Sequence, residues 1–373
     1  MKLLFFSGNA HLILDEASTR TSGGAELQVA LLARQLAHAG HDVVLAGGDS
    51  GQPDRVTLQG VKTRNAGKFH TGNLLEMLGA IPRVVRVLRD ERPDWVVVQG
   101  WTAWLFILWV LRRFLGYRLD FTCALDSEIN GAYRRENPVF GTLFEFAVRH
   151  CDARHAITRD QMDCFARRGM DSTLYRYLVF PRNRPLAAEK RVDFLWVSRC
   201  QPVKRPHLFV ELARAVPGAS FEMICPPENR TLWEEVARAA ASCPNLRLIE
   251  SVPYHEIQEH YDRARIFVNT SEWEGWPNSF IQAGLGETAI LSLTVNPDGI
   301  IGRFQMGFHA DGDWNKFFQT ARYVLSDPPR LREMQIGAAR FVAEMHDNEK
   351  ETLAFLAGIT GRGSELVSAG NRG

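Results

Sequence analysis

Several common signals are missing from this sequence of 373 residues. No apolar run reaches the roughly 20 residues that a helix needs to span a bilayer. The apolar start, which ends at Gly8, is too short for a signal peptide, and we expect it to form a first strand. The formal net charge is only +1, so no bulk attraction to nucleic acid is expected.

Metal and disulfide patterns are missing as well. The six cysteines are scattered and include no C-x-x-C pair, which favours reduced thiols in a cytoplasmic protein. The eleven histidines show neither H-E-x-x-H nor another ligand spacing, so no metal site is predicted. The sequence also contains no G-x-S-x-G elbow and no P-loop.

What the chain does contain is a repeated alternation of strand-like and helix-like segments. Its length favours two domains, and the alternation predicts a parallel, doubly wound α/β sheet in each. We expect a first domain over residues 1–182, a polar, proline-bounded linker at 183–190 and a second domain over 191–347. A last helix is expected near 348–360, followed by a disordered tail at 361–373.

One stretch after an expected strand at Arg265–Asn269 concentrates the features of a ligand site. It carries Glu274 and Gly275, places Pro277 at an expected first helical position, and leads into a short helix from Ser279. Ligands bind at the carboxyl ends of strands in such sheets, and a helix N-terminus offers free N–H groups to an anion. Glycine lets the backbone approach a ligand closely. The alternative is that Glu274 is an ordinary acid near a helix N-terminus.

The stretch Glu274-Gly275-Trp276-Pro277 resembles the donor-site signature of retaining family 4 glycosyltransferases, which have the GT-B fold. That signature typically reads Glu-Gly-Phe-Pro, with a second glutamate eight positions after the first. Here Trp276 replaces the phenylalanine, and Gln282 stands at the eighth position. The resemblance covers almost the whole chain. It implies two Rossmann-like domains that face each other across a cleft, with the last helix returning to the first domain.

The resemblance also assigns roles to two cations. The family has an arginine and, five positions later, a lysine, and Arg199 and Lys204 match these two residues. Both are aimed at the donor pyrophosphate in the family. Arginine can hold phosphate with two parallel hydrogen bonds, and lysine supplies a mobile charge. Together they would stabilise the leaving nucleoside diphosphate without a metal. Without the resemblance, an arginine and a lysine in a loop are ordinarily solvated surface residues.

Other donor contacts are implied by position. Glu274 would contact the transferred sugar, and the sugar and phosphate would also lie near Gly275 and the amides of Trp276, Asn278 and Ser279. In the first domain, Gly23 and Gly24 match a glycine pair that reaches toward the donor diphosphate, although most such pairs are simple turns.

Two departures from the family pattern bear on activity. Gln282 can still hydrogen-bond the nucleotide ribose but lacks a carboxylate charge. Either the ribose is held more weakly, or the donor differs, or activity is lost. No histidine follows the strand that leads to a catalytic-site histidine in many members. Asp126 is the nearest candidate to face the sugar, and it can equally be a helix cap or turn residue.

The resemblance implies a retaining, metal-independent transfer of a sugar from a UDP- or GDP-linked donor, with no bound cofactor. The acceptor would be a glycan, a lipid-linked sugar or a small molecule, as in polysaccharide biosynthesis. Two alternatives stay open: a GT-B epimerase acting on a nucleotide sugar, and a catalytically inactive GT-B scaffold.

The most apolar run, within Trp101–Arg113, holds three tryptophans and ends in arginines. A buried core helix is the default for this length. The tryptophans and the basic end also suit a helix at a membrane surface. The sequence therefore raises the expectation of peripheral contact with the inner face of the membrane through this run.

Overall fold

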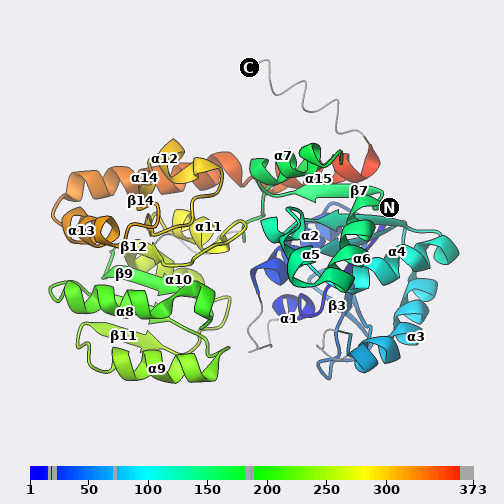
Figure 1. Cartoon of the computed structure of the whole chain (residues 1–373), viewed down its shortest axis with the longest axis horizontal. Helices are drawn as coiled ribbons and strands as arrows, with labels where there is room; N and C mark the ends of the chain where they lie inside the picture. Colours follow the sequence, from blue (N-terminus) through cyan, green and yellow to red (C-terminus); the bar gives the residue numbers. More distant parts are fainter. Residues whose placement is uncertain (16–17, 19–22, 70–73, 181–185, 187–188, 362–373) are drawn as a thin grey trace, which may run out of the picture. The chain divides into compact units, whose positions relative to one another are not determined.

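The computed structural model of the chain describes residues 1–15, 18, 23–69, 74–180, 186 and 189–361. The chain divides into two compact units (Figure 1). Unit 1 comprises Met1–Leu178 with Asn348–Gly373, and unit 2 comprises Val179–Asp347. The division falls shortly before the predicted linker. Most of that linker and nearly all of the predicted tail lie outside the described residues.

An eight-stranded sheet forms the centre of unit 1, in the order β3-β4-β2-β1-β5-β6-β7-β8. Its strands are β1 (Lys2–Phe6), β2 (Asp42–Gly47), β3 (Arg55–Leu58), β4 (Val61–Asn65), β5 (Trp95–Gln99), β6 (Arg118–Thr122), β7 (Ala153–Ala156) and β8 (Thr173–Leu174). Neighbouring strands run parallel except in the β3–β4 hairpin. The sequence analysis did not anticipate this hairpin, because β3 is half exposed and carries no apolar run.

Helices cover both faces of this sheet (Figure 1). They are α1 (His11–Leu14), α2 (Gly24–His38), α3 (Leu74–Glu91), α4 (Trp104–Leu115), α5 (Ala132–Glu136), α6 (Pro138–Arg149), α7 (Arg159–Arg167) and α15 (Asn348–Thr360), with the 3-10 turn η1 at Asp126–Glu128. The helix α4 begins at Trp104, three residues after the start of the apolar run.

The last helix, α15, is bound to unit 1 through a buried polar group. In the fully buried His155, Nδ1 lies 2.7 Å from Asp120 Oδ1, and Nε2 lies 3.1 Å from the carbonyl oxygen of Phe355. Gly358 permits this approach, since a Cβ there would lie only 2.3 Å from His155 Nε2. The helix α15 is therefore part of the core of unit 1.

Unit 2 contains a six-stranded parallel sheet in the order β11-β10-β9-β12-β13-β14. The strands are β9 (Val192–Val197), β10 (Phe221–Ile224), β11 (Leu246–Ile249), β12 (Ala264–Asn269), β13 (Ala289–Ser292) and β14 (Gly307–His309). The chain winds outward from β9 to β11, returns to the other side of β9 with β12, and then winds outward to β14. Open α/β sheets bind ligands at the carboxyl ends of their strands, beside the point where the winding reverses. In unit 2 this point lies between β9 and β12, and we call the carboxyl ends of these two strands the β9–β12 edge.

The helices of unit 2 are α8 (Pro206–Ala215), α9 (Arg230–Ala240), α10 (Ile257–Arg263), α11 (Asn278–Leu285), α12 (Ile300–Phe304), α13 (Trp314–Val324) and α14 (Pro328–Met345), with 3-10 turns η2 (Pro202–Lys204) and η3 (Pro297–Gly299). One expectation needs correction: α11 begins at Asn278, and Pro277 is its N-cap with extended backbone dihedrals. Close packing fixes α11 against α14, because a Cβ on Gly284 would lie 2.6 Å from the carbonyl oxygen of Ala338.

Candidate functional site

The loops that follow β9 and β12 bring two predicted site residues together. Lys204 Nζ lies 3.2 Å from Glu274 Oε1, and the two side chains are only 17% and 16% exposed. Since water screens this pair poorly, its charges interact more strongly than those of a surface pair. The pair lies at the point where the winding of the sheet reverses.

The carboxylate of Glu274 is held through one of its two oxygens. Oε1 accepts hydrogen bonds from Asn269 Nδ2 at 2.9 Å and from Ser271 Oγ at 2.6 Å, besides facing Lys204. Within the described part of the chain, Glu274 Oε2 takes no hydrogen bond. The side chain is therefore oriented before any ligand binds, and one oxygen remains able to accept a hydrogen bond from a ligand hydroxyl.

Arg205 links the same loops through its side chain. Its guanidinium donates to the carbonyl oxygens of Thr270 at 2.7 Å and Ser271 at 3.0 Å, and to Thr294 Oγ1 at 2.7 Å. Thr270 Oγ1 in turn donates to the carbonyl oxygen of Lys204 at 2.7 Å. The sequence analysis missed Arg205, because its role depends on three loops that meet only in the folded sheet.

Arg199 has a different acidic partner. It forms an ion pair with Glu228 at 2.7 Å, and both side chains are more than 40% exposed. Glu228 belongs to the loop after β10 and also accepts a hydrogen bond from Gln201. Exposed pairs contribute only about 0–1 kcal/mol, so a ligand phosphate can replace Glu228 as the partner of Arg199.

The other residues of unit 2 that are predicted to contact the donor follow Glu274 in the sequence. Gly275 and Trp276 are buried, and Asn278 and Ser279 form the first turn of the helix. Gln282 follows one turn later and is half-buried. Its carbonyl oxygen accepts from Gln258 Nε2 at 3.0 Å, whereas its side-chain amide has no hydrogen-bond partner among the described residues.

The predicted residues of unit 1 lie at the ends of helices. Gly23 is the N-cap of α2 and Gly24 is its first residue. Asp126 opens η1, and its Oδ1 accepts from Gln161 Nε2 of α7 at 3.0 Å. This contact fixes the carboxylate of Asp126 within unit 1, and its role toward a sugar stays a prediction.

A buried carboxyl group close to Asp126 was missed by the sequence analysis. Glu128 is 3% exposed; its Oε1 accepts from the Trp101 amide at 2.9 Å, and its Oε2 accepts from the Ala124 amide at 2.8 Å. It thereby joins the loops that follow β5 and β6. Burial raises the pKa of Glu128 to about 7. Such a raised pKa makes the stability of the folded chain depend on pH below neutrality.

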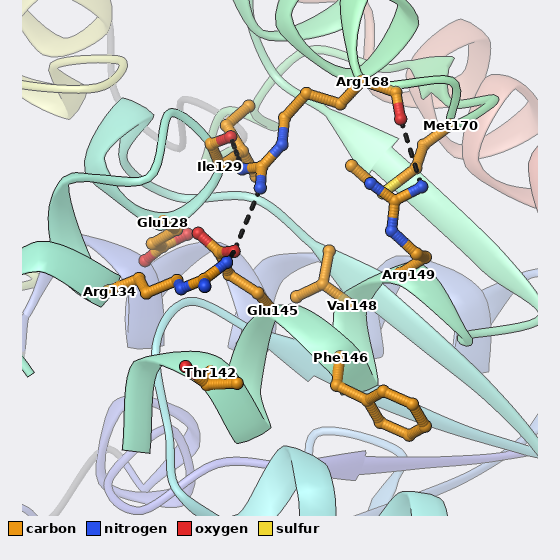
Figure 2. A pocket seen from close by; sticks show the side chains of 10 residues that line it. All are labelled: Glu128, Ile129, Arg134, Thr142, Glu145, Phe146, Val148, Arg149, Arg168 and Met170. Atoms are coloured by element: carbon orange, nitrogen blue, oxygen red, sulfur yellow. Dashed lines mark hydrogen bonds and ion pairs between the residues drawn. The ribbon is translucent and has the colours of Figure 1, made fainter. Parts of the chain in front are cut away.

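A cavity of about 220 Å³ lies beside Glu128 (Figure 2). Arg168 donates to Glu145 at 3.0 Å and to the carbonyl oxygen of Ile129, and Arg134 lies 3.6 Å from the same Glu145 carboxylate. The residues that line the cavity belong to or follow η1, α5, α6 and α7: Glu128, Ile129, Arg134, Thr142, Glu145, Phe146, Val148, Arg149, Arg168 and Met170. Most of the cavity surface is apolar, and among its charged residues Glu145 pairs with both Arg134 and Arg168.

No group of three or more His, Cys, Asp or Glu side chains in the described part of the chain is arranged to hold a metal ion. None of the helices that the structure describes is long and apolar enough to cross a membrane.

Comparison with protein families identifies the chain. A model of the "Glycosyl transferase 4-like domain" matches residues 23–182, and a model of "Glycosyl transferases group 1" matches residues 181–341. The chain belongs to the group 1 glycosyltransferases. The second match includes Arg199, Lys204, Glu274 and Gln282. Comparison with curated proteins by sequence gives no significant match for this glycosyltransferase.

Solved structures show that the glycosyltransferase has the GT-B fold. A sucrose-phosphate synthase from Thermosynechococcus elongatus matches with a TM-score of 0.77 and 16% identity, over 99% of this chain and 100% of that one. WaaG, a glycosyltransferase involved in lipopolysaccharide biosynthesis, matches at 0.70 and 14%, over 97% and 100%. A trehalose-6-phosphate protein from E. coli with bound UDP-2-fluoro glucose matches at 0.70 and 11%, over 96% and 99%.

Proposed function

We propose that this glycosyltransferase moves a sugar from a UDP- or GDP-linked donor to an acceptor, with retention at the anomeric carbon and without a metal ion. The acceptor is a glycan, a lipid-linked sugar or a small molecule, as in polysaccharide biosynthesis. The observation that carries the proposal is the shielded Lys204–Glu274 pair at the β9–β12 edge. It offers a cation for a phosphate and an oriented carboxylate for a sugar hydroxyl.

Each charged residue has a part in this proposal. Lys204 exchanges part of its contact with Glu274 for the donor pyrophosphate, and Arg199 leaves Glu228 for the same group. The two cations stabilise the negative charge that develops on the leaving nucleoside diphosphate. Glu274 Oε2 accepts from a hydroxyl of the transferred sugar, and Gln282 contacts the ribose. The roles that the family pattern gives Gly23, Gly24 and Asp126 stay predictions.

The chemical step needs no nucleophile from the protein. The bond between the anomeric carbon and the diphosphate oxygen breaks, and a bond to the acceptor oxygen forms on the same face. The acceptor hydroxyl gives its proton to the departing diphosphate. The anomeric carbon keeps its configuration in this step. The charge that needs stabilisation develops on the leaving diphosphate, and Lys204 and Arg199 would stabilise it.

The similar structures support parts of this proposal without deciding them. One was solved with a UDP-linked sugar analogue, which supports a UDP donor. Another takes part in lipopolysaccharide biosynthesis, which supports a glycan or lipid-linked acceptor. We propose that the protein acts in the cytoplasm, at the inner face of the membrane where the acceptor is lipid-linked.

The deciding experiment incubates the purified protein with a panel of UDP- and GDP-sugars, with and without candidate acceptors. Release of nucleoside diphosphate with formation of an α-linked product from an α-linked donor supports the proposal. An isomerised nucleotide sugar would instead identify an epimerase, and no reaction with any donor would favour an inactive scaffold. Chelation with EDTA is expected to leave turnover unchanged.

Arg199 provides the sharper test of the phosphate contact. Arg199→Ala is expected to lower turnover roughly 10²–10³-fold, because it removes a charge-assisted contact to a developing charge. The fold should persist, since Arg199 pairs only at the surface with Glu228. Glu228→Ala is the matched control and should keep turnover close to that of the wild type. Unchanged turnover in Arg199→Ala would remove this residue from the donor site.

A further inference from the structure

Large apolar side chains are exposed along two neighbouring helices of unit 1. On α4 and α6 they form what we call the α4–α6 surface, made up of Val110, Phe114, Val139, Phe140, Leu143 and Phe146. Phe114 is 79% exposed and Val139 is 71% exposed. Contiguous exposed apolar residues are uncommon on soluble monomers and mark sites of interaction.

Aromatic contacts pack the two helices against each other. The ring of Phe146 in α6 lies 4.9 Å from that of Trp109 and 6.3 Å from that of Phe106, both in α4. Trp109 is half-buried and directly precedes the exposed Val110. The two helices lie next to each other in Figure 1. The exposed residues of α6 and α4 therefore lie on neighbouring helices.

The structure revises which residues of the predicted Trp101–Arg113 run could reach a membrane. Trp104 is 1% exposed, and its Nε1 donates to the carbonyl oxygen of Phe69 at 3.0 Å, so it belongs to the core. Trp101 is 46% exposed but precedes α4 and packs against Tyr133. Contact would depend on the second half of α4 together with α6, which the sequence analysis did not consider.

Basic side chains accompany the apolar ones. The helices α4, α5 and α6 carry the exposed Arg113, Arg135 and Arg149. They also carry Arg112, which pairs with Asp152, and Arg134, which lies 3.6 Å from Glu145. Arg113 lies over the ring of Trp109 at 5.6 Å, next to Phe114 in sequence. Arg149 is exposed and lines the same cavity as Phe146 (Figure 2). Apolar groups flanked by arginines complement a lipid surface that carries negative charge.

We propose that the α4–α6 surface docks this protein on a membrane that contains anionic phospholipid. The apolar side chains enter the boundary between head groups and acyl chains, and the arginines contact lipid phosphates. The inference rests on the proposed function in one respect, since it favours the lipid-linked acceptor among the alternatives. Docking itself needs neither donor nor turnover.

Sedimentation with vesicles tests the proposal on the full chain. Vesicles of phosphatidylcholine alone are compared with vesicles that also contain phosphatidylglycerol, each at low and high salt. We expect the wild type to pellet with the anionic vesicles at low salt and to bind severalfold more weakly at high salt. Triple replacement Phe114→Ser, Val139→Ser, Phe140→Ser is expected to weaken binding at least about tenfold, because it removes apolar area that would enter the membrane.

Charge and position are tested by further variants. Arg113→Gln with Arg149→Gln should weaken binding to the anionic vesicles by about fivefold for each arginine. The control is Ile336→Ser in α14, where an equally accessible apolar residue (53% exposed) lies in unit 2. This variant should bind vesicles like the wild type. Thermal melting confirms that each variant is folded, and release of nucleoside diphosphate with a water-soluble acceptor reports the transferase independently.

Three results would overturn the docking proposal. One is folded wild-type protein that stays in the supernatant with every vesicle. Another is pelleting that none of the surface variants reduces. The third is a dimer in light scattering that the triple variant dissociates, without vesicle binding, because the surface would then be an interface between copies. Each of these leaves the transferase assay unaffected, so a failure of docking is distinguishable from a failure of the proposed function.

Discussion

Each sheet has a glutamate near the carboxyl ends of its strands, and the two glutamates have different hydrogen-bond partners. In unit 2, Glu274 faces Lys204 and receives its other hydrogen bonds from the side chains of Asn269 and Ser271. In unit 1, Glu128 receives its hydrogen bonds from the backbone amides of Trp101 and Ala124, and burial raises its pKa to about 7.

This difference separates two uses of a carboxylate. Glu274 is charge-compensated and keeps one oxygen available, which suits contact with a polar ligand. Glu128 has both oxygens engaged by the chain itself, which suits the positioning of two loops. The comparison predicts that changes at the unit 2 edge mainly affect catalysis, whereas a change at Glu128 mainly affects stability and its pH dependence.

The largest expected effect is on catalysis at the unit 2 edge. Lys204→Met removes the cation that faces Glu274 and, in the proposed function, the donor pyrophosphate. Turnover should fall roughly 10²–10³-fold. Measurement of initial rates at saturating donor and acceptor would show it, together with a melting curve to establish that the variant is folded.

Lys316→Met is the matched control for this change. Lys316 is an exposed lysine of α13, outside the loops that hold the site. It should retain the rate of the wild type. If folded Lys204→Met kept full turnover, the prediction that changes at the unit 2 edge mainly affect catalysis would be wrong.

The next effect concerns unit 1 and pH. The carboxyl of Glu128 has a pKa of about 7 in the folded protein against an ordinary value of 4.5. Below pH 4.5 both states are protonated. As pH rises from there to 7, the unfolded state loses its proton first, so the folded state loses stability. The full loss above pH 7 is about 3 kcal/mol.

Glu128→Gln cannot lose a proton, so the free energy of unfolding of the wild type minus that of the variant should fall by about 3 kcal/mol as pH rises across this interval. Urea unfolding at several pH values between 4.5 and 8 measures that difference. Glu136→Gln replaces an exposed carboxyl of α5 and should show the same pH dependence as the wild type. A Glu128→Gln protein that loses stability with pH as steeply as the wild type would exclude Glu128 as the titrating group.

Local patterns were sufficient to predict the unit 2 motif. Glu274, Gly275 and Trp276 are consecutive, and they follow an apolar strand and precede a helix, so their placement depends on short-range order. The alternation of strands and helices likewise predicted two parallel α/β sheets. The resemblance to the family assigned Arg199 and Lys204 to the donor pyrophosphate, and this assignment stays a prediction. The structure gives them different acidic partners, Glu228 for Arg199 and Glu274 for Lys204.

The residues that were missed depend on contacts between distant segments. Arg205 gains its role from carbonyl oxygens of loops after β12 and β13. Glu128 looks in the sequence like any polar residue after a strand, and only burial between two loops makes its pKa unusual. The exposed face of α6 was also missed, since periodicity shows that a helix has an apolar face but does not show what covers it.

The smallest expected effect is on the ribose contact at Gln282. The family pattern has a glutamate at this position, and the amide of Gln282 lacks any partner among the described residues. It is therefore able to take a ligand hydroxyl as its partner. Gln282→Glu should tighten donor binding by about 1 kcal/mol, the difference between a neutral and a charge-assisted hydrogen bond.

Isothermal titration of the donor into wild type and variant measures this difference. Gln319→Glu, which adds the same charge to an exposed position of α13, separates a local contact from a general change in charge. Tighter binding in Gln282→Glu but not in Gln319→Glu would extend the unit 2 site from the Lys204–Glu274 pair to the first turns of α11. Weaker binding in Gln282→Glu would mean that this amide makes a contact with the donor that a carboxylate cannot make. A donation from its NH₂ group is one such contact, and the donor of this protein would then be held differently from the family pattern.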